Sequence, residues 1–93
     1  MSSTFANRAL GTRERVLTDG RRVTIRHAVP SDAPRIAIAF ETSRDATWGF
    51  DLVACDDHGA VVGHVRSTKD LAIVRAWTGS GLDSLLTREL EDA

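Results

Sequence analysis

Residues 69–93 read KDLAIVRAWTGSGLDSLLTRELEDA, a stretch that predicts a strand, a glycine loop and a helix in succession. The apolar run LAIV at residues 71–74 is typical of a strand buried on both faces inside a sheet. The loop is predicted at Gly79-Ser80-Gly81. The helix after it has apolar residues at helical spacing: Leu82, Leu85, Leu86, Leu90 and Ala93. A strand that runs through a glycine loop into a helix presents free backbone N–H groups and a positive dipole end, which suits a phosphate or diphosphate.

Length and composition indicate one small globular domain. The chain has 93 residues, of which 42% are hydrophobic and 27% charged, and it contains no long apolar run, so no membrane-spanning segment is expected. The first dozen residues are polar and lack the apolar centre of a signal peptide. We therefore expect a cytoplasmic protein with a flexible tail at residues 1–12 and a single domain at residues 13–93. Cys55 is the single cysteine, which excludes an internal disulfide.

The net charge of −1 hides an asymmetry between the two halves of the chain. Residues 1–44 carry eight arginines against four acidic residues, a charge of +4, whereas residues 45–93 carry four basic and nine acidic residues, a charge of −5. We interpret the halves as two solvated faces in preference to an electrostatic docking surface. Nucleic-acid binding is not expected, because the arginines are not interleaved with aromatic residues and the chain has no tyrosine.

A hairpin and a helix are predicted first. Residues 13–17 and 22–27 flank Asp19-Gly20, a dipeptide that favours a tight hairpin turn. Ser31 is placed to cap a helix, with one proline before it and another in the first turn. The helix is expected to end near residues 42–44. Its inward stripe is formed by residues at helical spacing: Ala33, Ile36, Ala37 and Phe40.

A second hairpin follows a short connection. Trp48 in that connection is interpreted as a core residue, with a lid over a ligand as the alternative. Residues 50–55 and 60–66 are predicted to pair around a turn at residues 56–59. A metal site is disfavoured for the three residues of ligand type, because their spacing matches no closed four-ligand pattern: Cys55, His58 and His64.

These elements predict an α+β fold with a mixed, mostly antiparallel sheet of four or five strands and two main helices packed on it. The apolar positions of the strands and helices supply the predicted core. Its members are Val23, Ile25, Ile36, Phe40, Leu52, Val62, Ile73, Leu82, Leu85, Leu86 and Leu90.

The order of elements resembles the GNAT superfamily of acyl-CoA-dependent N-acetyltransferases. LTDGRRVTIRHAVPSDAPRI, from residue 17, is similar to the family's first strand and helix, especially in the protein-lysine acetyltransferase branch. DLVACDDHGAVVGHVR, from residue 51, is similar to the second and third strands. LAIVRAW at residues 71–77 resembles the fourth strand, and TGSGLDSLLTRELEDA from residue 78 resembles the acyl-CoA pyrophosphate loop and its helix. The resemblance covers residues 15–93.

The resemblance implies acetyl-CoA as co-substrate and an amine, either a small molecule or a protein lysine, as acceptor. The base that deprotonates the ammonium would be a carboxylate near the cleft, for which Asp70 is chosen over Glu41 and Asp51. The residues implied in binding acetyl-CoA are Val74, Arg75, Trp77, Thr78, Gly79, Ser80, Gly81, Leu82 and Asp83.

The chain also departs from the family's pattern. Asp83 puts a carboxylate where the pyrophosphate would be bound, and Ser80 with Asp83 reads as a capping box that would satisfy the helix without a ligand. The family's fifth strand is not found after the last helix, and no tyrosine is present to act as the general acid. The chain is therefore interpreted as a C-terminally truncated GNAT-like domain.

Three hypotheses follow. The chain is a GNAT-like N-acetyltransferase domain, a non-catalytic remnant that binds partners or binds CoA weakly, or a small α+β domain that resembles the family by convergence. In the first two cases the strand at residues 69–75 lacks the neighbour that would shield its edge. A homodimer through this exposed edge is expected.

Overall fold

The computed structural model describes residues 12–41 and 44–92, so the predicted tail lies almost entirely outside the described residues. Five strands form one sheet in the order β1-β2-β3-β4-β5, with every neighbouring pair antiparallel. The strands are β1 (Arg13–Val16), β2 (Arg22–His27), β3 (Leu52–Cys55), β4 (Val61–Val65) and β5 (Leu71–Ile73). The helices are α2 (Ala33–Phe40) and α3 (Leu82–Asp92), preceded by the 3-10 turns η1 (Pro30–Asp32) and η2 (Arg75–Trp77), respectively.

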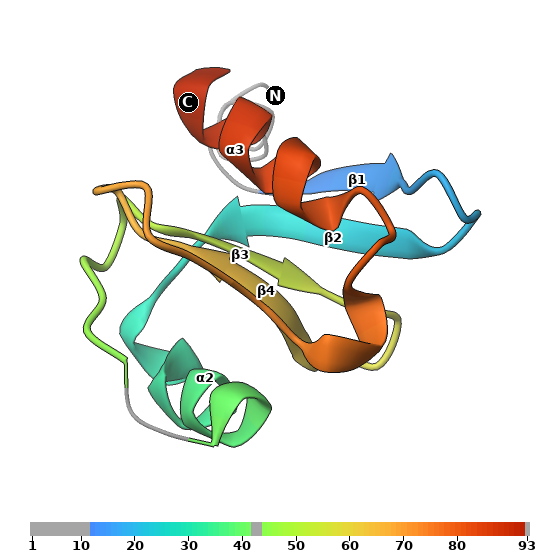
Figure 1. The fold of residues 1–93 in the computed structure, drawn as a ribbon. Helices are drawn as coiled ribbons and strands as arrows, with labels where there is room; N and C mark the ends of the chain where they lie inside the picture. Colours follow the sequence, from blue (N-terminus) through green and yellow to red (C-terminus); the bar gives the residue numbers. More distant parts are fainter. Residues whose placement is uncertain (1–11, 42–43, 93) are drawn as a thin grey trace, which may run out of the picture.

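The two helices cover opposite faces of the sheet, which gives three layers (Figure 1). This arrangement confirms the predicted α+β class with two main helices. None of the helices in residues 12–41 and 44–92 has the length and apolarity needed to span a bilayer.

The face under α3 holds the larger apolar core. Gly63 of β4 allows α3 to approach closely, because a Cβ at this position would lie 2.8 Å from Leu86 Cδ1 and 3.1 Å from Leu82 Cδ2. Glycine at position 63 therefore lets the sheet and the helix pack closely. The buried members of this core are Leu17, Val23, Ile25, Leu52, Ala54, Val62, Val65, Leu82 and Leu86.

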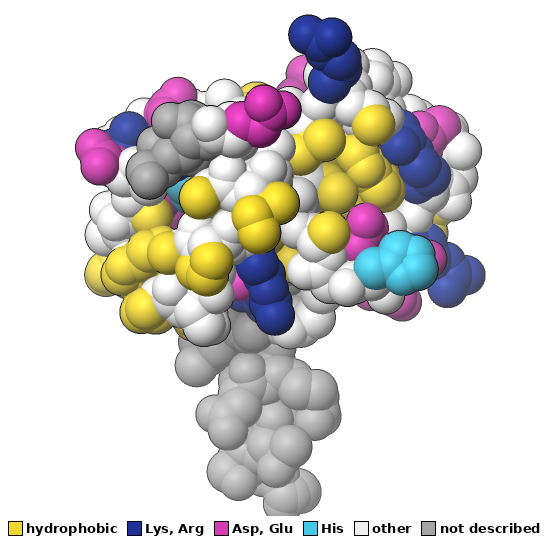
Figure 2. Space-filling model, turned by 90° about the horizontal axis from the view of Figure 1, so that it is seen from below, with side chains coloured by type: hydrophobic (Ala, Val, Ile, Leu, Met, Phe, Trp, Pro, Cys, Tyr) yellow, Lys and Arg dark blue, Asp and Glu magenta, His cyan; other side chains and the backbone are white. Residues whose placement is uncertain are grey.

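The face under α2 holds a smaller apolar core formed by Ala28, Ile36, Val53, Cys55 and Val61. A bulge in β4 supplies the last of these residues, because Cys55 pairs with Val61 while Ala54 pairs with Gly63. The extra residue, Val62, belongs to the opposite core. Figure 2 shows this side of the molecule, where hydrophobic side chains gather in patches at the surface and charged side chains lie mostly around them.

The predicted core is largely confirmed. Residues Val23, Ile25, Ile36, Leu52, Val62, Leu82 and Leu86 are buried, and Phe40, Ile73, Leu85 and Leu90 are half-buried against them.

Several local predictions are wrong. Trp48 is 36% exposed and does not fill the core. Ser31 does not cap α2, because the chain enters the helix through η1 and the cap position belongs to Asp32. The helix ends at Phe40, where Glu41 takes a left-handed conformation with φ of 57°. The strand predicted at residues 71–74 is not buried on both faces, since β5 is the half-buried edge of the described sheet.

Candidate functional site

The predicted phosphate loop follows β5 and joins η2 to α3. Gly79 and Gly81 have φ of +81° and +89°, a region that other residues rarely adopt. A Cβ on Gly81 would also lie 3.4 Å from Thr18 Oγ1 in the β1–β2 turn. Both glycines are thus favoured by backbone conformation, and a side chain on Gly81 would meet Thr18 only at ordinary van der Waals distance.

Ser80, between the two glycines, is only 1% exposed and is fixed from two sides. Its hydroxyl donates to the Trp77 carbonyl at 2.6 Å. Its own carbonyl accepts from the Thr18 hydroxyl at 2.8 Å and from the Thr18 amide at 3.3 Å. The β1–β2 turn therefore holds the loop in place.

The predicted capping box of Ser80 and Asp83 is wrong. Helix α3 begins at Leu82, and the Leu85 amide donates to the Gly81 carbonyl at 3.0 Å, so Gly81 occupies the cap position. Ser80 lies one residue too early to cap the helix, and its hydroxyl bonds to Trp77 instead. Asp83 lies exposed in the first turn of α3.

No described side chain accepts a hydrogen bond from the first turn of α3, which leaves backbone donors available. Within the described part of the chain, the amides of residues 79–84 donate to no other group. Consecutive free amides at a helix N-terminus can bind an anion. Asp83 opposes this, because its carboxylate would share the helix terminus with the bound anion.

The other residues of the predicted acyl-CoA site have structural roles. Val74 donates its amide to the Val62 carbonyl at 2.9 Å and continues the ladder beyond β5. Leu82 is 1% exposed and belongs to the core, so its side chain cannot contact a ligand. Arg75 and Thr78 are exposed, and the Thr78 hydroxyl donates to the Arg75 carbonyl at 2.8 Å.

Trp77 packs on the core under α3, and its ring is covered by Arg21 at 4.0 Å from the ring centroid. Arg21 also donates to the Ala76 carbonyl at 3.0 Å and forms an ion pair of 2.7 Å with Asp19. The hydrogen bond from Arg21 lowers the pKa of the Asp19 carboxyl. The β1–β2 turn thus contacts η2 as well as the glycine loop.

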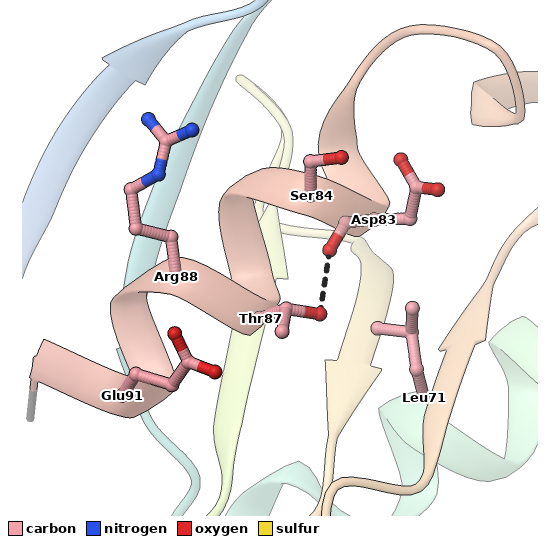
Figure 3. A pocket seen from close by; sticks show the side chains of 6 residues that line it. All are labelled: Leu71, Asp83, Ser84, Thr87, Arg88 and Glu91. Atoms are coloured by element: carbon pink, nitrogen blue, oxygen red, sulfur yellow. Dashed lines mark hydrogen bonds between the residues drawn. The ribbon is translucent and has the colours of Figure 1, made fainter.

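A hollow of about 350 Å³ lies between the edge of β5 and the outer face of α3. Figure 3 shows Leu71 opposite the polar side chains of the helix, with Asp83 at the end nearest the glycine loop. The lining residues are Leu71, Asp83, Ser84, Thr87, Arg88 and Glu91.

Asp70, the predicted base, lies at the other end of β5. One of its oxygens is 3.1 Å from Arg44 Nη2 and 3.5 Å from Arg66 Nη1. Both contacts are made by Oδ2, and the Asp70 side chain is half exposed, so an amine can approach the carboxylate without displacing either arginine. Of the two carboxylates ranked below it, Glu41 is exposed at the end of α2 and Asp51 is completely buried, out of reach of a substrate.

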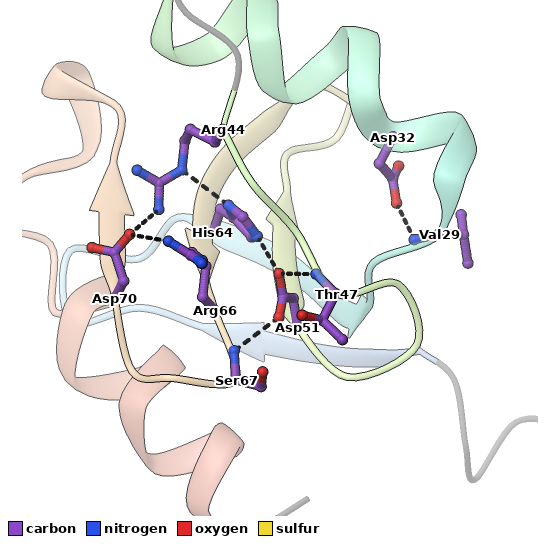
Figure 4. Close-up of polar contacts among 9 residues, drawn as sticks. All are labelled: Val29, Asp32, Arg44, Thr47, Asp51, His64, Arg66, Ser67 and Asp70. Atoms are coloured by element: carbon purple, nitrogen blue, oxygen red, sulfur yellow. Dashed lines mark hydrogen bonds and ion pairs between the residues drawn. The ribbon is translucent and has the colours of Figure 1, made fainter.

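Asp51 and His64 form the centre of a buried polar network that also reaches Asp70 (Figure 4). His64 Nε2 lies 3.1 Å from Asp51 Oδ2, and Arg44 Nε–H donates to His64 Nδ1 at 3.1 Å. An arginine nitrogen can only donate, so Nδ1 must be the acceptor and Nε2 must carry the proton. Burial lowers the pKa of His64, while the hydrogen bond to Asp51 raises it in part.

Asp51 ties three segments together. Its Oδ2 also accepts from the Thr47 amide at 2.9 Å, and its Oδ1 accepts from the Ser67 amide at 2.8 Å. Because the histidine, the Thr47 turn and the β4–β5 turn all meet at this carboxylate, it holds that end of the sheet together.

A second buried carboxylate lies on the same face. Asp32 receives two hydrogen bonds from Arg26, of 2.7 and 2.8 Å, and one of 2.9 Å from the Val29 amide. The hydrogen bonds from Arg26 lower the pKa of Asp32. Burial raises the pKa of the Cys55 thiol beside it, which argues against a reactive cysteine.

No group of three potential metal ligands occurs among the described histidine, cysteine and acidic residues. Cys55 faces Arg26, His64 faces Arg44 and Asp51, and His58 lies exposed in the β3–β4 turn.

Neither a scan against family models nor searches of curated proteins and solved structures finds a match to this chain.

Sequence reasoning missed the partners of His64 and Asp32. The signal for the first was a histidine within the apolar strand VVGHV, since a buried polar side chain needs hydrogen-bonding partners. The partner Arg44 could not be found by periodicity, because it lies in the connection between α2 and β3.

Proposed function

We propose that the chain is an acyl-CoA-dependent N-acyltransferase domain of the GNAT type, with acetyl-CoA as co-substrate. The observation that carries this proposal is the glycine loop after β5, where residues 79–84 have free amides within the described chain. The succession of antiparallel strands, glycine loop and α3 also supports it, because this order of elements resembles that of the GNAT superfamily. The loop amides suit the diphosphate of CoA.

In this proposal β5 connects the two ends of the ligand. The diphosphate would be held at the loop that follows β5, and the thioester would lie toward Asp70, which precedes the strand. The acceptor amine attacks the thioester carbonyl, a C–N bond forms, the C–S bond breaks, and CoA leaves as its thiol. Asp70 accepts the proton that the ammonium must lose before attack. The acceptor would be a small amine or a protein lysine.

The test is a thermal-shift titration with acetyl-CoA and with CoA. A ligand at about 100 times its dissociation constant should stabilise the protein by about 2.7 kcal/mol. Asp83→Asn removes the carboxylate from the loop while keeping the size of the side chain, so it should tighten binding. Glu91→Gln, at the far end of the same hollow, is the charge-matched control and should change affinity less. Absence of a shift with both ligands, or weaker binding by Asp83→Asn, would contradict the proposal.

A second candidate function is a non-catalytic module that retains the loop. The observation in its favour is the pairing of Asp70 Oδ2 with two guanidinium groups, which engages one oxygen of the proposed base. Acetyl transfer to a panel of amines and lysine peptides separates the two candidates. Binding without turnover, unchanged in Asp70→Asn, would favour the module; turnover that Asp70→Asn abolishes would favour the enzyme.

We further propose that the partner at the edge of β5 is a second copy of the chain. Arg66 donates its amide to the Asp70 carbonyl and Val74 donates to the Val62 carbonyl, so the alternating backbone groups of Leu71 and Ile73 point away from β4. A two-fold antiparallel pairing centred on Ala72 would join each of these residues to the other in the second copy. The edge is self-complementary, as a closed dimer requires.

Light scattering after gel filtration tests the dimer. Leu71→Pro removes an outward amide without removing a bond to β4, so a folded monomer is expected. Ala72→Pro, the matched control, removes an amide that faces β4 and should destabilise the fold. A wild-type protein that stays monomeric at high micromolar concentration would contradict the dimer.

A further inference from the structure

His64 lies at the centre of a polar chain that links two otherwise separate connections of the fold. Arg44, in the connection between α2 and β3, contacts the imidazole through Nε and Asp70 through Nη2. Asp70 precedes β5, so Arg44 bridges the connection after α2 to the start of the edge strand (Figure 4). His64 itself is fully buried.

The bridge depends on the protonation state of one nitrogen. Neutral His64 with its proton on Nε2 donates to Asp51 and accepts from Arg44. Doubly protonated His64 would still donate to Asp51, but its Nδ1–H would face the Arg44 Nε–H at 3.1 Å, with two positive charges in contact. The contact with Asp51 therefore survives protonation, and the contact with Arg44 does not.

We propose that the contact between Arg44 and His64 is an acid-released latch: protonation of His64 expels Arg44 and frees Asp70 from one of its two guanidinium partners. This inference does not depend on the proposed enzymatic function. The response is local, because the Thr47 and Ser67 amides remain bound to the Asp51 carboxylate. It couples pH to the start of β5, the strand whose edge is proposed to recruit a second copy.

The charged groups around the imidazole set the direction of the response. Burial disfavours its protonation most, Asp51 before β3 favours it, and Arg44 from the connection and Arg66 just after β4 disfavour it further. On the α2 side Arg44 lies over the Phe40 ring, 5.5 Å from the centroid, and from the β4–β5 turn it meets Asp70. The latch is therefore held at neutral pH and released on the acid side of the ordinary histidine range.

Side-chain nitrogen-15 NMR provides the test. At pH 7.5 we expect His64 to be protonated only on Nε2, with a scalar coupling between Arg44 Nε and His64 Nδ1 across their hydrogen bond. As His64 becomes protonated the coupling should vanish and exchange of the Arg44 Nε–H with water should accelerate at least tenfold, at the same pH, while the Thr47 and Ser67 amides stay protected. A proton on Nδ1 at pH 7.5, or a coupling that survives acidification, overturns the proposal.

Two variants make the test specific. Arg44→Met removes the latch, so His64 should take up its proton at higher pH and the acid-dependent change in the Asp70 carboxyl resonance should disappear. Arg66→Met keeps the contact between Arg44 and His64 and is the matched control, in which that change should persist. An Asp70 response that is unaffected by Arg44→Met would show that Arg44 does not transmit it, and would overturn the proposal.

Discussion

Helix α3 covers its face of the sheet mainly with aliphatic side chains and buries one charged group, Glu89, which pairs with Arg13 and Arg15 of β1. The opposite face buries the charged and polar groups Asp32, Asp51 and His64 beside a smaller apolar core. The first face depends on shape, as the close approach at Gly63 illustrates. The second depends on protonation, since each of its buried carboxylates is satisfied by a donor of fixed charge or tautomer.

Each side buries a carboxylate whose pKa is lowered: Asp32 by its hydrogen bonds from Arg26, and Glu89 under α3, where burial opposes the shift and the hydrogen bonds from Arg13 and Arg15 outweigh it. Both sides should therefore lose stability in acid, and the side of Asp32 should also respond nearer neutral pH because it buries His64.

The largest expected effect is on the apolar face. Leu86→Ala removes a fully buried side chain and should lower the free energy of unfolding by about 3 kcal/mol. Because no titrating group is removed, the loss should be the same at pH 5.5 and pH 8. Urea denaturation at both pH values measures it, with the half-buried Leu90→Ala as a milder control. A loss that changes markedly between the two pH values would show that the faces are not independent.

The next largest effect is expected from removing the buried ion pair between Asp32 and Arg26 on the opposite face. Asp32→Asn deprives Arg26 of its anionic partner and should cost about 2 kcal/mol at pH 7. Arg26 holds the pKa of Asp32 below its ordinary value of 3.8, so this stabilisation is complete above that value and is lost as pH falls through the lower, folded-state pKa. Denaturation of both proteins between pH 3 and pH 7 should show the difference shrink only at the acid end. Asp57→Asn, in an exposed turn, should have almost no effect.

A smaller effect is expected where α3 approaches the sheet closely at Gly63. Gly63→Ala should cost about 1.5 kcal/mol, because the added methyl group would overlap Leu86. Combining it with Leu86→Val should cost less than the sum of the two single changes, since the smaller side chain makes room. The four free energies come from one set of denaturation curves. Strict additivity would mean that the close approach does not constrain this position.

The smallest expected effect is a dependence of the free energy of unfolding on pH, caused by His64. Burial holds the pKa of His64 below its ordinary value of 6.5, so the unfolded chain takes up a proton before the folded one does. The free energy of unfolding should be constant above pH 6.5 and should fall below it, by at most about 1.4 kcal/mol per pH unit, down to the folded-state pKa. His64→Gln should abolish this slope. An equal slope in that variant would assign the pH dependence to other groups.

Periodicity and turn residues predicted the sheet, both hairpins and both helices, because these depend on local pattern: Asp19-Gly20 marks one turn and the spaced leucines mark α3. Local pattern could not identify the edge strand. The run LAIV at residues 71–74 is as apolar as a central strand, yet β5 has a neighbour on one side only in the described sheet.

Local pattern likewise predicted only part of the candidate site. A glycine loop was predicted at residues 79–81, and both of its glycines have the positive φ that glycine readily adopts. The capping prediction failed because Ser80 found a closer acceptor in Trp77, a contact set by the 3-10 turn that precedes it. The contact of Thr18 with the loop spans 62 positions in sequence, and no local pattern signals it.

The most direct test of a ligand at the glycine loop is an amide NMR titration of the labelled protein with CoA. The predicted result is a set of saturable shift changes centred on residues 79–84, whose amides have no acceptor among the described residues, with the amides of Thr47 and Ser67 unaffected. Pantetheine, the part of CoA that carries the thiol and has no phosphate, should leave the loop amides unchanged at the same concentration. The absence of shifts at residues 79–84 with CoA, or equal shifts with pantetheine, would contradict a diphosphate site at this loop.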